Sequence, residues 1–225
     1  MAITRVATTD LDNHSGTTIT ISHPGGNCDA VFVWIDRWAT VDATGVTYGG
    51  VAMTKLSSIV DLPTRSIWGL NDCYPGTQDV VVTQPDGSKT CIVGVATYKG
   101  VSRTATFPNT TNETRSPGGG GAPDNLTVAV TTTVDNCILL GLGAHKGLIA
   151  DEHAPSTNTT RFSLFNDGSG NGDSGMLESD PFNTGTAGSK SLRITLGSTG
   201  QELCLLVVAI APSTTIPLTG SPMII

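Results

Sequence analysis

The sequence predicts an all-β protein whose antiparallel strands form a sandwich or a barrel. Three observations support this prediction. Apolar and polar residues alternate in many short segments, as they do in strands with one buried face. Glycine and proline, at 27 and 12 of the 225 residues, separate these segments. No segment has the 3.6-residue apolar period and the cap of a long helix. Roughly a dozen short strands at such spacing are typical of sandwiches and barrels.

The strands follow one another along the chain with few interruptions. Alternation is clearest in residues 17–22, where Ile19 and Ile21 share a face, and in residues 126–131 and 192–196. Further strands are expected at residues 29–36, 46–48, 51–56, 65–70, 79–83, 90–98, 137–144, 161–165 and 203–211.

Two turns have a specific chemistry. Gly49 and Gly50 separate two strand-like triplets, and glycine suits both central positions of a type I′ hairpin turn. Residues 85–87, Pro-Asp-Gly, lie between two valine-rich strands and predict a second turn.

One β-sandwich domain is expected at residues 17–212, between an N-terminal arm at 1–16 and an extended C-terminal tail at 213–225. The tail contains two prolines and ends on apolar residues, which favours an extended segment over a folded element. Two stretches without strand patterning, residues 107–125 and 166–189, are expected to be long loops of this domain.

Three of the expected strands lack alternation. Residues 30–35, 138–144 and 203–211 are apolar at nearly every position. A strand of a free-standing sandwich should present polar residues to water on one side. The outward faces of these strands are therefore expected to be covered, by a loop or another strand layer, or else by a neighbouring subunit.

Charge and targeting signals exclude some classes of protein. Twelve scattered basic residues against 19 acidic ones give a net charge of −7, which is unsuited to binding a nucleic acid backbone. The first residues lack the apolar core of a secretory signal. No apolar run approaches the length of a membrane helix, so neither nucleic acid nor membrane is expected as a partner.

The cysteine pattern favours free thiols. There are five cysteines, an odd number, and none belongs to a CxxC pair. Three of them, Cys91, Cys137 and Cys204, lie in or beside apolar strand segments. We therefore expect buried free thiols and assembly in a reducing cytoplasm.

The segment NDGSGNGDSGML, residues 166–177, is the most distinctive candidate site. The spacing from Asp167 to Glu178, with Gly172 at the sixth position, resembles an EF-hand calcium loop. Its flanks do not have helical patterns, so a plain projecting turn is the preferred interpretation and calcium coordination the alternative. The candidate oxygen ligands are Asp167, Ser169, Asn171, Asp173 and Glu178.

Catalytic interpretations find little support. Gly172–Gly175 reads GDSG, as around the nucleophile of chymotrypsin-like proteases, with Ser174 in the nucleophile position. His145 and Asp151 are much too close to it in sequence for that fold. Neither His145 nor His153 belongs to a recognised metal-binding spacing. We therefore expect a protein that is not an enzyme and has no cofactor other than the alternative calcium ion.

Four segments follow one another in the order of a known sandwich module: VTYGGVAMTKL, RSIWGLNDCYPGTQDVVVT, CIVGVATYKGVSRTATF and SLRITLGSTGQELCLLVVAIAP. Together they resemble a β-sandwich module of tailed-phage virion proteins and some bacterial surface proteins. Their order and spacing match over roughly residues 17–212. The resemblance implies a jelly-roll-like sandwich that serves as a scaffold, head decoration or adhesive part, often as a homo-oligomer, without shared catalytic residues.

The expected function is accordingly that of a phage structural protein. It would be a capsid-stabilising head decoration or a fibre-like surface component, assembled in the host cytoplasm and exposed on the virion. Its expected partners are copies of itself, with a trimer favoured, other virion proteins such as the capsid, and host-surface glycans. The alternative is an extracellular carbohydrate-binding or adhesin module, with or without calcium.

Overall fold

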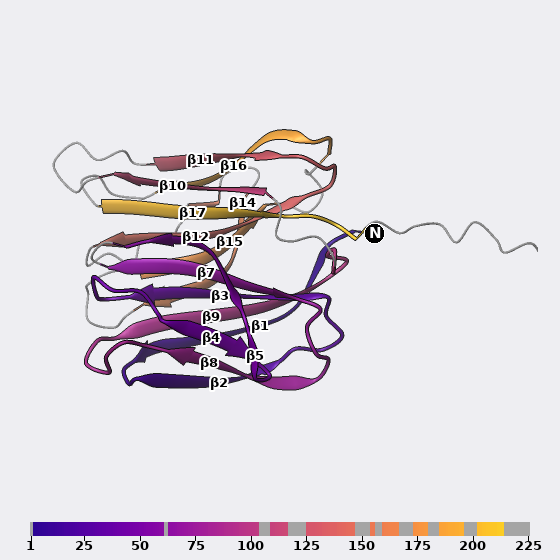
Figure 1. Cartoon of the computed structure of the whole chain (residues 1–225). Helices are drawn as coiled ribbons and strands as arrows, with labels where there is room; N and C mark the ends of the chain where they lie inside the picture. The colour runs from indigo at the N-terminus through magenta and orange to yellow at the C-terminus, as the bar shows by residue number, and fades with distance from the viewer. Residues whose placement is uncertain are drawn as a thin grey trace, which may run out of the picture.

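A computed structural model describes residues 2–60, 63–103, 109–116, 125–146, 154–155, 159–166, 173–179, 185–195 and 202–213. These residues form antiparallel strands in four sheets, which lie one above another in Figure 1. Two five-stranded sheets, here the inner sheets, pack face to face. A smaller outer sheet covers the other side of each. The predicted all-β, jelly-roll-like sandwich is therefore confirmed.

The first half of the chain builds one inner and one outer sheet. The first inner sheet has the order β1-β9-β3-β7-β6, with β1 Thr4–His14, β3 Ala30–Arg37, β6 Thr54–Ile59, β7 Thr64–Asn71 and β9 Cys91–Lys99. The first outer sheet has the order β2-β8-β4-β5, with β2 Thr18–Pro24, β4 Gly45–Tyr48, β5 Val51–Ala52 and β8 Thr77–Thr83.

The second half builds the other two sheets. The second inner sheet has the order β10-β17-β12-β15-β14, with β10 Asn109–Ser116, β12 Ile138–Lys146, β14 Thr159–Asn166, β15 Asp173–Ser179 and β17 Glu202–Ile210. The second outer sheet has the order β11-β16-β13, with β11 Asn125–Thr132, β13 Ala154–Pro155 and β16 Gly188–Thr195.

The two halves have the same topology. The two inner sheets have the same strand order when β1 is matched with β10, β3 with β12, β6 with β14, β7 with β15 and β9 with β17. In both, the first strand pairs with the last, the connectivity of a jelly roll in which the chain alternates between sheets. The chain is thus a tandem pair of jelly-roll-like sandwiches, a first sandwich and a second sandwich, joined through their inner sheets.

The two sandwiches are stacked with corresponding ends together. Val101, just after β9, forms an antiparallel bridge with Pro212, just after β17. Ser213 donates its backbone N–H to the Gly100 carbonyl at 2.6 Å, and Ser102 donates to the Ala211 carbonyl at 3.0 Å. At the inner-sheet edges, β1 lies against β14, and β10 lies against β6. The two contacts are equivalent, because β1 corresponds to β10 and β6 to β14.

Three apolar cores separate the four sheets. The central core, between the inner sheets, contains Phe32, Trp34, Leu140, Leu142 and Leu206. A second core lies between the first inner and outer sheets and a third between the second inner and outer sheets. Burial of apolar surface in these three layers supplies the main favourable free energy of folding.

The three strands without alternation are the ones that lie between two cores. Strand β3 directs Phe32 and Trp34 into the central core and Val31 and Val33 toward the first outer sheet. Strands β12 and β17 divide their side chains in the same way between the central and third cores. The sequence left open what covers the outward faces of these strands. In the structure a further strand layer of the same chain covers them, so these strands leave no apolar face for a neighbouring subunit.

Two glycines allow the second outer sheet to approach β12. A Cβ at Gly141 would lie 2.8 Å from Leu192 Cδ1, and one at Gly143 would lie 3.0 Å from Ile194 Cγ2. Glycine at these positions leaves room for the larger side chains of β16 and explains why β12 reads as leucine alternating with glycine.

All the strands expected from the sequence are present, together with four that were not expected: β1, β10, β13 and β15. The long-loop prediction is therefore wrong at residues 109–116 and 173–179, which are strands. The stretch assigned to an N-terminal arm contains β1, which pairs with β9 over most of its length as an edge of the first inner sheet.

Gly49 and Gly50 have φ values of 55° and 81°, as the predicted type I′ turn requires. Residues 214–225 of the predicted tail lie outside the described residues.

Candidate functional site

The predicted calcium ligands do not form a loop where the structure describes them. Asp167, Ser169 and Asn171 lie outside the described residues. Asp173 and Glu178 belong to β15, which pairs with β12 and β14. Five residues of extended strand place their Cα atoms roughly 16 Å apart. Because the other three candidate ligands lie outside the described residues, calcium coordination stays a prediction, and the structure adds that Asp173 and Glu178 are strand residues.

Glu178 is instead part of a polar bridge between the two sandwiches. Arg5 Nη1, from β1, lies 2.9 Å from Glu178 Oε1. The hydroxyl of Tyr98, from β9, donates to Glu178 Oε2 at 3.0 Å. Burial raises the pKa of Glu178, although Arg5 and the Tyr98 hydrogen bond act in the opposite direction. Both carboxylate oxygens are thus engaged by residues of the first sandwich.

Ser174, the residue in the protease-like GDSG, forms a second bridge of this kind. Its side chain is fully buried and donates its hydroxyl to Asp36 of β3. Asp36 also accepts from Arg65 Nε of β7 at 3.4 Å. A nucleophile must be reached by its substrate, so a buried serine that donates to a structural carboxylate does not serve as one. Of the two histidines considered above, His145 lies on β12 and His153 outside the described residues.

The buried side chain of Arg37 holds together the loops at one end of the first sandwich. Arg37 Nε donates to Gln84 Oε1 at 2.5 Å, and Nη2 lies 2.8 Å from Asp86 Oδ2. Nη1 donates to the Val41 carbonyl. One guanidinium thus fastens the loop after β3 to the loop after β8, because its fork offers several donors in fixed directions.

A second cluster lies near this end. Lys55 Nζ of β6 lies 2.7 Å from Asp42 Oδ2 and 4.9 Å from the centroid of the Trp68 ring. Ser66 donates to Asp42 Oδ1 at 2.9 Å and accepts from Trp68 Nε1 at 3.0 Å. Each of these polar groups meets a partner within the cluster, and together they fix the loop between β3 and β4 that contains Asp42.

His23 is a buried histidine with two hydroxyl partners. Its Nδ1 lies 2.9 Å from Thr9 Oγ1 and its Nε2 lies 3.4 Å from Thr97 Oγ1. Burial lowers its pKa from 6.5 to about 4, so it is neutral at neutral pH. It connects β2 of the first outer sheet to β1 and β9 of the first inner sheet.

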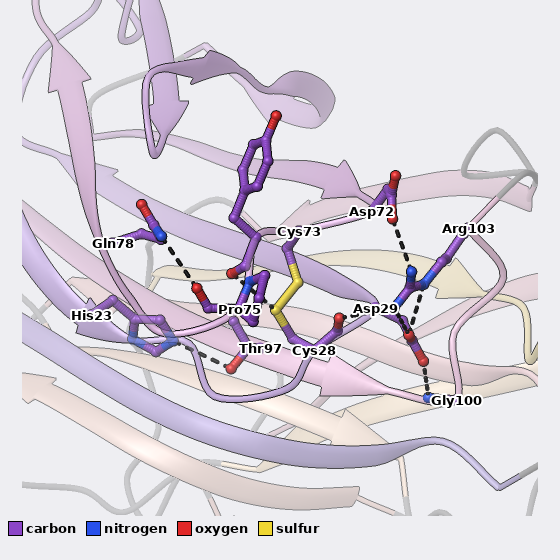
Figure 2. The surroundings of a disulfide bond; sticks show 11 residues. His23, Cys28, Asp29, Asp72, Cys73, Pro75, Gln78, Thr97, Gly100 and Arg103 are labelled. Atoms are coloured by element: carbon purple, nitrogen blue, oxygen red, sulfur yellow. Dashed lines mark hydrogen bonds and ion pairs between the residues drawn. A yellow bond between two sulfur atoms is a disulfide. The ribbon is translucent and has the colours of Figure 1, made fainter.

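The opposite end of the first sandwich is closed by a disulfide between Cys28 and Cys73, drawn in Figure 2. We call this the disulfide end; it comprises residues 25–29, 72–76 and 100–103. The prediction of free thiols is wrong for these two cysteines and confirmed for Cys91, Cys137 and Cys204, which are free and buried. Ala30 of β3 pairs with Asn71 of β7, so cysteines two positions beyond each strand face one another. That proximity depends on strand pairing, which cysteine spacing alone does not reveal.

Ion pairs reinforce the disulfide end. Arg103 Nη2 lies 2.7 Å from Asp29 Oδ1, and its Nη1 lies 3.1 Å from Asp72 Oδ1. The other oxygen of Asp29 accepts the backbone N–H of Gly100 at 2.6 Å. Figure 2 shows the guanidinium of Arg103 between the two carboxylates, beside the disulfide. Three separate chain segments are therefore held at this end by one covalent bond and one ionic fork.

The disulfide end also presents an unburied aromatic side chain. Tyr74, directly after Cys73, is 53% exposed. Its neighbours Asp72 and Arg103 have exposed side chains as well. The described residues contain no group of three or more histidine, cysteine, aspartate or glutamate side chains that could hold a metal ion. The disulfide end is thus the candidate binding site of the described surface, and hydrogen bonding and aromatic stacking are its chemistry.

The fold and this site define an all-β protein of two stacked jelly-roll-like sandwiches. No family model, no curated protein and no solved structure matches the chain. Within the described part of the chain, no helix is long and apolar enough to cross a membrane.

Proposed function

We propose that this chain is a non-enzymatic structural protein of a phage particle, carried on the virion surface as a head decoration or fibre-like component. The observation that supports the proposal best is the use of its buried polar side chains. Arg5, Asp36, Ser174 and Glu178 are engaged in bridges between the two sandwiches, Arg37 in a bridge between loops, and Asp42 in contacts between a loop and strands β6 and β7. Groups that an active site would leave available are committed here to rigidity.

The architecture suits such a role. Two sandwiches with a shared apolar core make one stiff block rather than two hinged domains, because separating them would expose the whole central core. The strand segments that resemble modules of tailed-phage virion proteins lie in both halves of this block, at β4 to β9 and at β16 to β17.

The sequence left open whether a further strand layer or a neighbouring subunit covers the doubly apolar strands. The doubly apolar strands are covered internally and give no support to a hydrophobic subunit interface. The outward face of β2 carries Thr18, Thr20 and Ser22, and that of β16 carries Ser189 and Ser191. Contacts of the described outer sheets with a capsid or with further copies would therefore be polar, and the trimer stays a prediction.

Particle analysis tests this proposal directly. Phage particles purified from lysates of the source would be analysed by mass spectrometry, and the chain is expected at a fixed ratio to the major capsid protein. Recombinant protein added to particles that lack it should co-sediment with them and saturate. Absence of the chain from purified particles, together with no co-sedimentation, would refute the structural role.

Light scattering after size-exclusion chromatography tests the predicted trimer. A trimer has three times the 23.1 kDa of the chain. A monomer at all concentrations would contradict the trimer and leave attachment to the particle as the remaining route of assembly.

A further inference from the structure

The loop between β7 and β8 presents an aromatic ring that no core uses. Tyr74 lies in this loop, at residues 72–76, and is the one exposed aromatic side chain among those whose burial the structure describes. By contrast, Trp34, Tyr48 and Tyr98 are almost completely buried. An exposed aromatic ring costs solvation free energy unless a ligand uses it, and such rings often anchor binding sites.

The loop is rigid, so the ring is presented in a defined position. The disulfide from Cys73 to Cys28 ties it to the loop before β3. Asp72 donates its backbone N–H to the Asp29 carbonyl at 2.7 Å, and Gly76 donates to the Gly26 carbonyl at 2.9 Å. Because these contacts restrict the free protein, little conformational entropy remains to be lost when a ligand binds.

Polar groups accompany the ring on the same loop and beside it. The side chain of Asp72 is 71% exposed and that of Arg103 is 51% exposed, and they form an ion pair. Arg103 also forms an ion pair with Asp29, so two carboxylates flank one guanidinium. The net charge of these three side chains is −1. This arrangement can accept and donate hydrogen bonds to hydroxyl groups, but it disfavours an acidic ligand.

The size of the feature identifies the kind of ligand. A stable protein interface buries about 800 Å² on each partner, with a central cluster of anchors. One ring, a carboxylate two residues before it on the same loop and the guanidinium paired with that carboxylate make a much smaller feature, which suits a single pyranose unit. The C–H face of such a sugar packs on an aromatic ring, while its hydroxyls pair with carboxylate and guanidinium groups.

We propose that the loop of residues 72–76 binds a neutral sugar unit of an extracellular glycan. Tyr74 is the stacking platform, and Asp72 and Arg103 hold the hydroxyls. The disulfide keeps the loop in its binding conformation. This binding activity does not depend on the particle role proposed above, and either can hold without the other.

Binding would be measured with the full-length, oxidised protein on a glycan array. Saturation-transfer-difference NMR would follow, with the methyl glycosides of glucose, galactose, mannose and N-acetylglucosamine. Tyr74→Ala should weaken binding of the best saccharide at least about tenfold, the equivalent of one good stacking contact. Tyr74→Phe keeps the ring and should retain binding.

Three further variants separate binding from folding. Val60→Ser alters an exposed residue after β6, at the opposite end of the first sandwich, and should leave binding unchanged. Asp72→Asn should weaken it because the amide is a poorer acceptor for hydroxyls. The pair Cys28→Ser with Cys73→Ser should weaken it while the β-sheet circular dichroism is kept.

Two results would overturn the proposal. One is the absence of any saccharide binding by the wild-type protein in both assays. The other is equal saccharide binding by the wild-type and Tyr74→Ala proteins. If Tyr74→Ala instead abolished attachment to phage particles while saccharides had no effect, the loop would be a protein contact and not a sugar site.

Discussion

At the scale of single residues, buried polar side chains decide how the sheets are joined. Glu178 belongs to the second sandwich, but its two oxygens are engaged by Arg5 and Tyr98 of the first. Ser174 and Asp36 repeat this relation between the same inner sheets. In an apolar layer such bridges fix the position of one sheet over the other, because any slip would leave a buried polar group without its partner.

The Glu178 bridge predicts a loss of stability on neutralisation. Glu178→Gln keeps the size of the side chain but removes the charge that pairs with Arg5. We expect the free energy of unfolding to fall by about 1–2 kcal/mol, a modest value because Arg5 is partly exposed. Urea unfolding measures this, with Asp79→Asn on the exposed face of β8 as control. A loss no larger than that of the control would contradict the bridge.

His23 predicts a dependence of stability on pH. Its pKa in the folded protein is about 4, against 6.5 for an ordinary histidine, so the unfolded chain binds the proton more readily. The stability contributed by neutral His23 is complete above pH 6.5 and is lost as the pH falls toward 4, by up to about 3 kcal/mol.

The measurement for His23 is a comparison of two proteins. The pKa of Glu178 is raised and acts in the opposite direction, so the wild-type curve alone mixes both effects. The difference in unfolding free energy between the wild-type protein and His23→Gln should shrink as the pH is lowered from 7 to 4. A difference that stays constant over that range would show that His23 does not titrate as its burial requires.

At the scale of elements, the sequence predicted strands well where apolar residues mark them. The alternation of Ile19 with Ile21 and the unbroken apolar run of β17 both correspond to observed strands. Strands β10 and β15 were missed because polar residues and glycine outnumber apolar residues in both. Their main support comes from backbone pairing with β17 and β12, which a local pattern does not contain.

The candidate site was harder to predict from the sequence than the strands, because it too depends on strand pairing. The calcium interpretation took Asp173 and Glu178 to be loop residues, whereas pairing with β12 makes them strand residues. The disulfide end brings together Cys28, Cys73 and Arg103, which are far apart in sequence. Only the register of β3 with β7 places the two cysteines opposite one another. Tyr74 could have been noticed as an aromatic residue in a turn-like Cys-Tyr-Pro-Gly sequence.

The close approach of β16 to β12 predicts that an added methyl group is not tolerated. Gly143→Ala would bring a Cβ to 3.0 Å from Ile194 Cγ2 and 3.1 Å from Leu177 Cδ1. We expect a loss of about 1–3 kcal/mol from overpacking, measured by thermal or urea unfolding. Gly45→Ala in β4 is the matched control, since nothing lies within 4 Å of its Cβ position. Equal stability of the two variants would contradict the packing of the second outer sheet.

The disulfide predicts a redox-dependent stability of the first sandwich. The Cys28–Cys73 bond closes a loop with a sequence separation of 45 residues. Its reduction, or the paired change Cys28→Ser with Cys73→Ser, should lower the unfolding free energy by about 2–4 kcal/mol. Calorimetry with and without reductant measures it, and the serine variant should not respond to reductant. A wild-type protein that does not respond either would mean that the bond is absent.

At the scale of the whole molecule, the chain uses one topology twice and buries the inner sheet of each copy against the other. This arrangement explains from the chain alone why three strands are apolar on both faces, because each lies between two of its cores. The sequence contained the signal, the missing alternation, but not its cause. Recognising the cause would have required seeing that the strand order of residues 4–99 returns in residues 109–210.

Amide hydrogen exchange at several protein concentrations tests this arrangement most directly. If the chain covers its own apolar strands, β3, β12 and β17 will be among the slowest-exchanging segments, and their protection will be the same in dilute and concentrated samples. Protection of these strands that appears only as the protein associates would mean that neighbouring subunits cover them, and would contradict the four-layer stack.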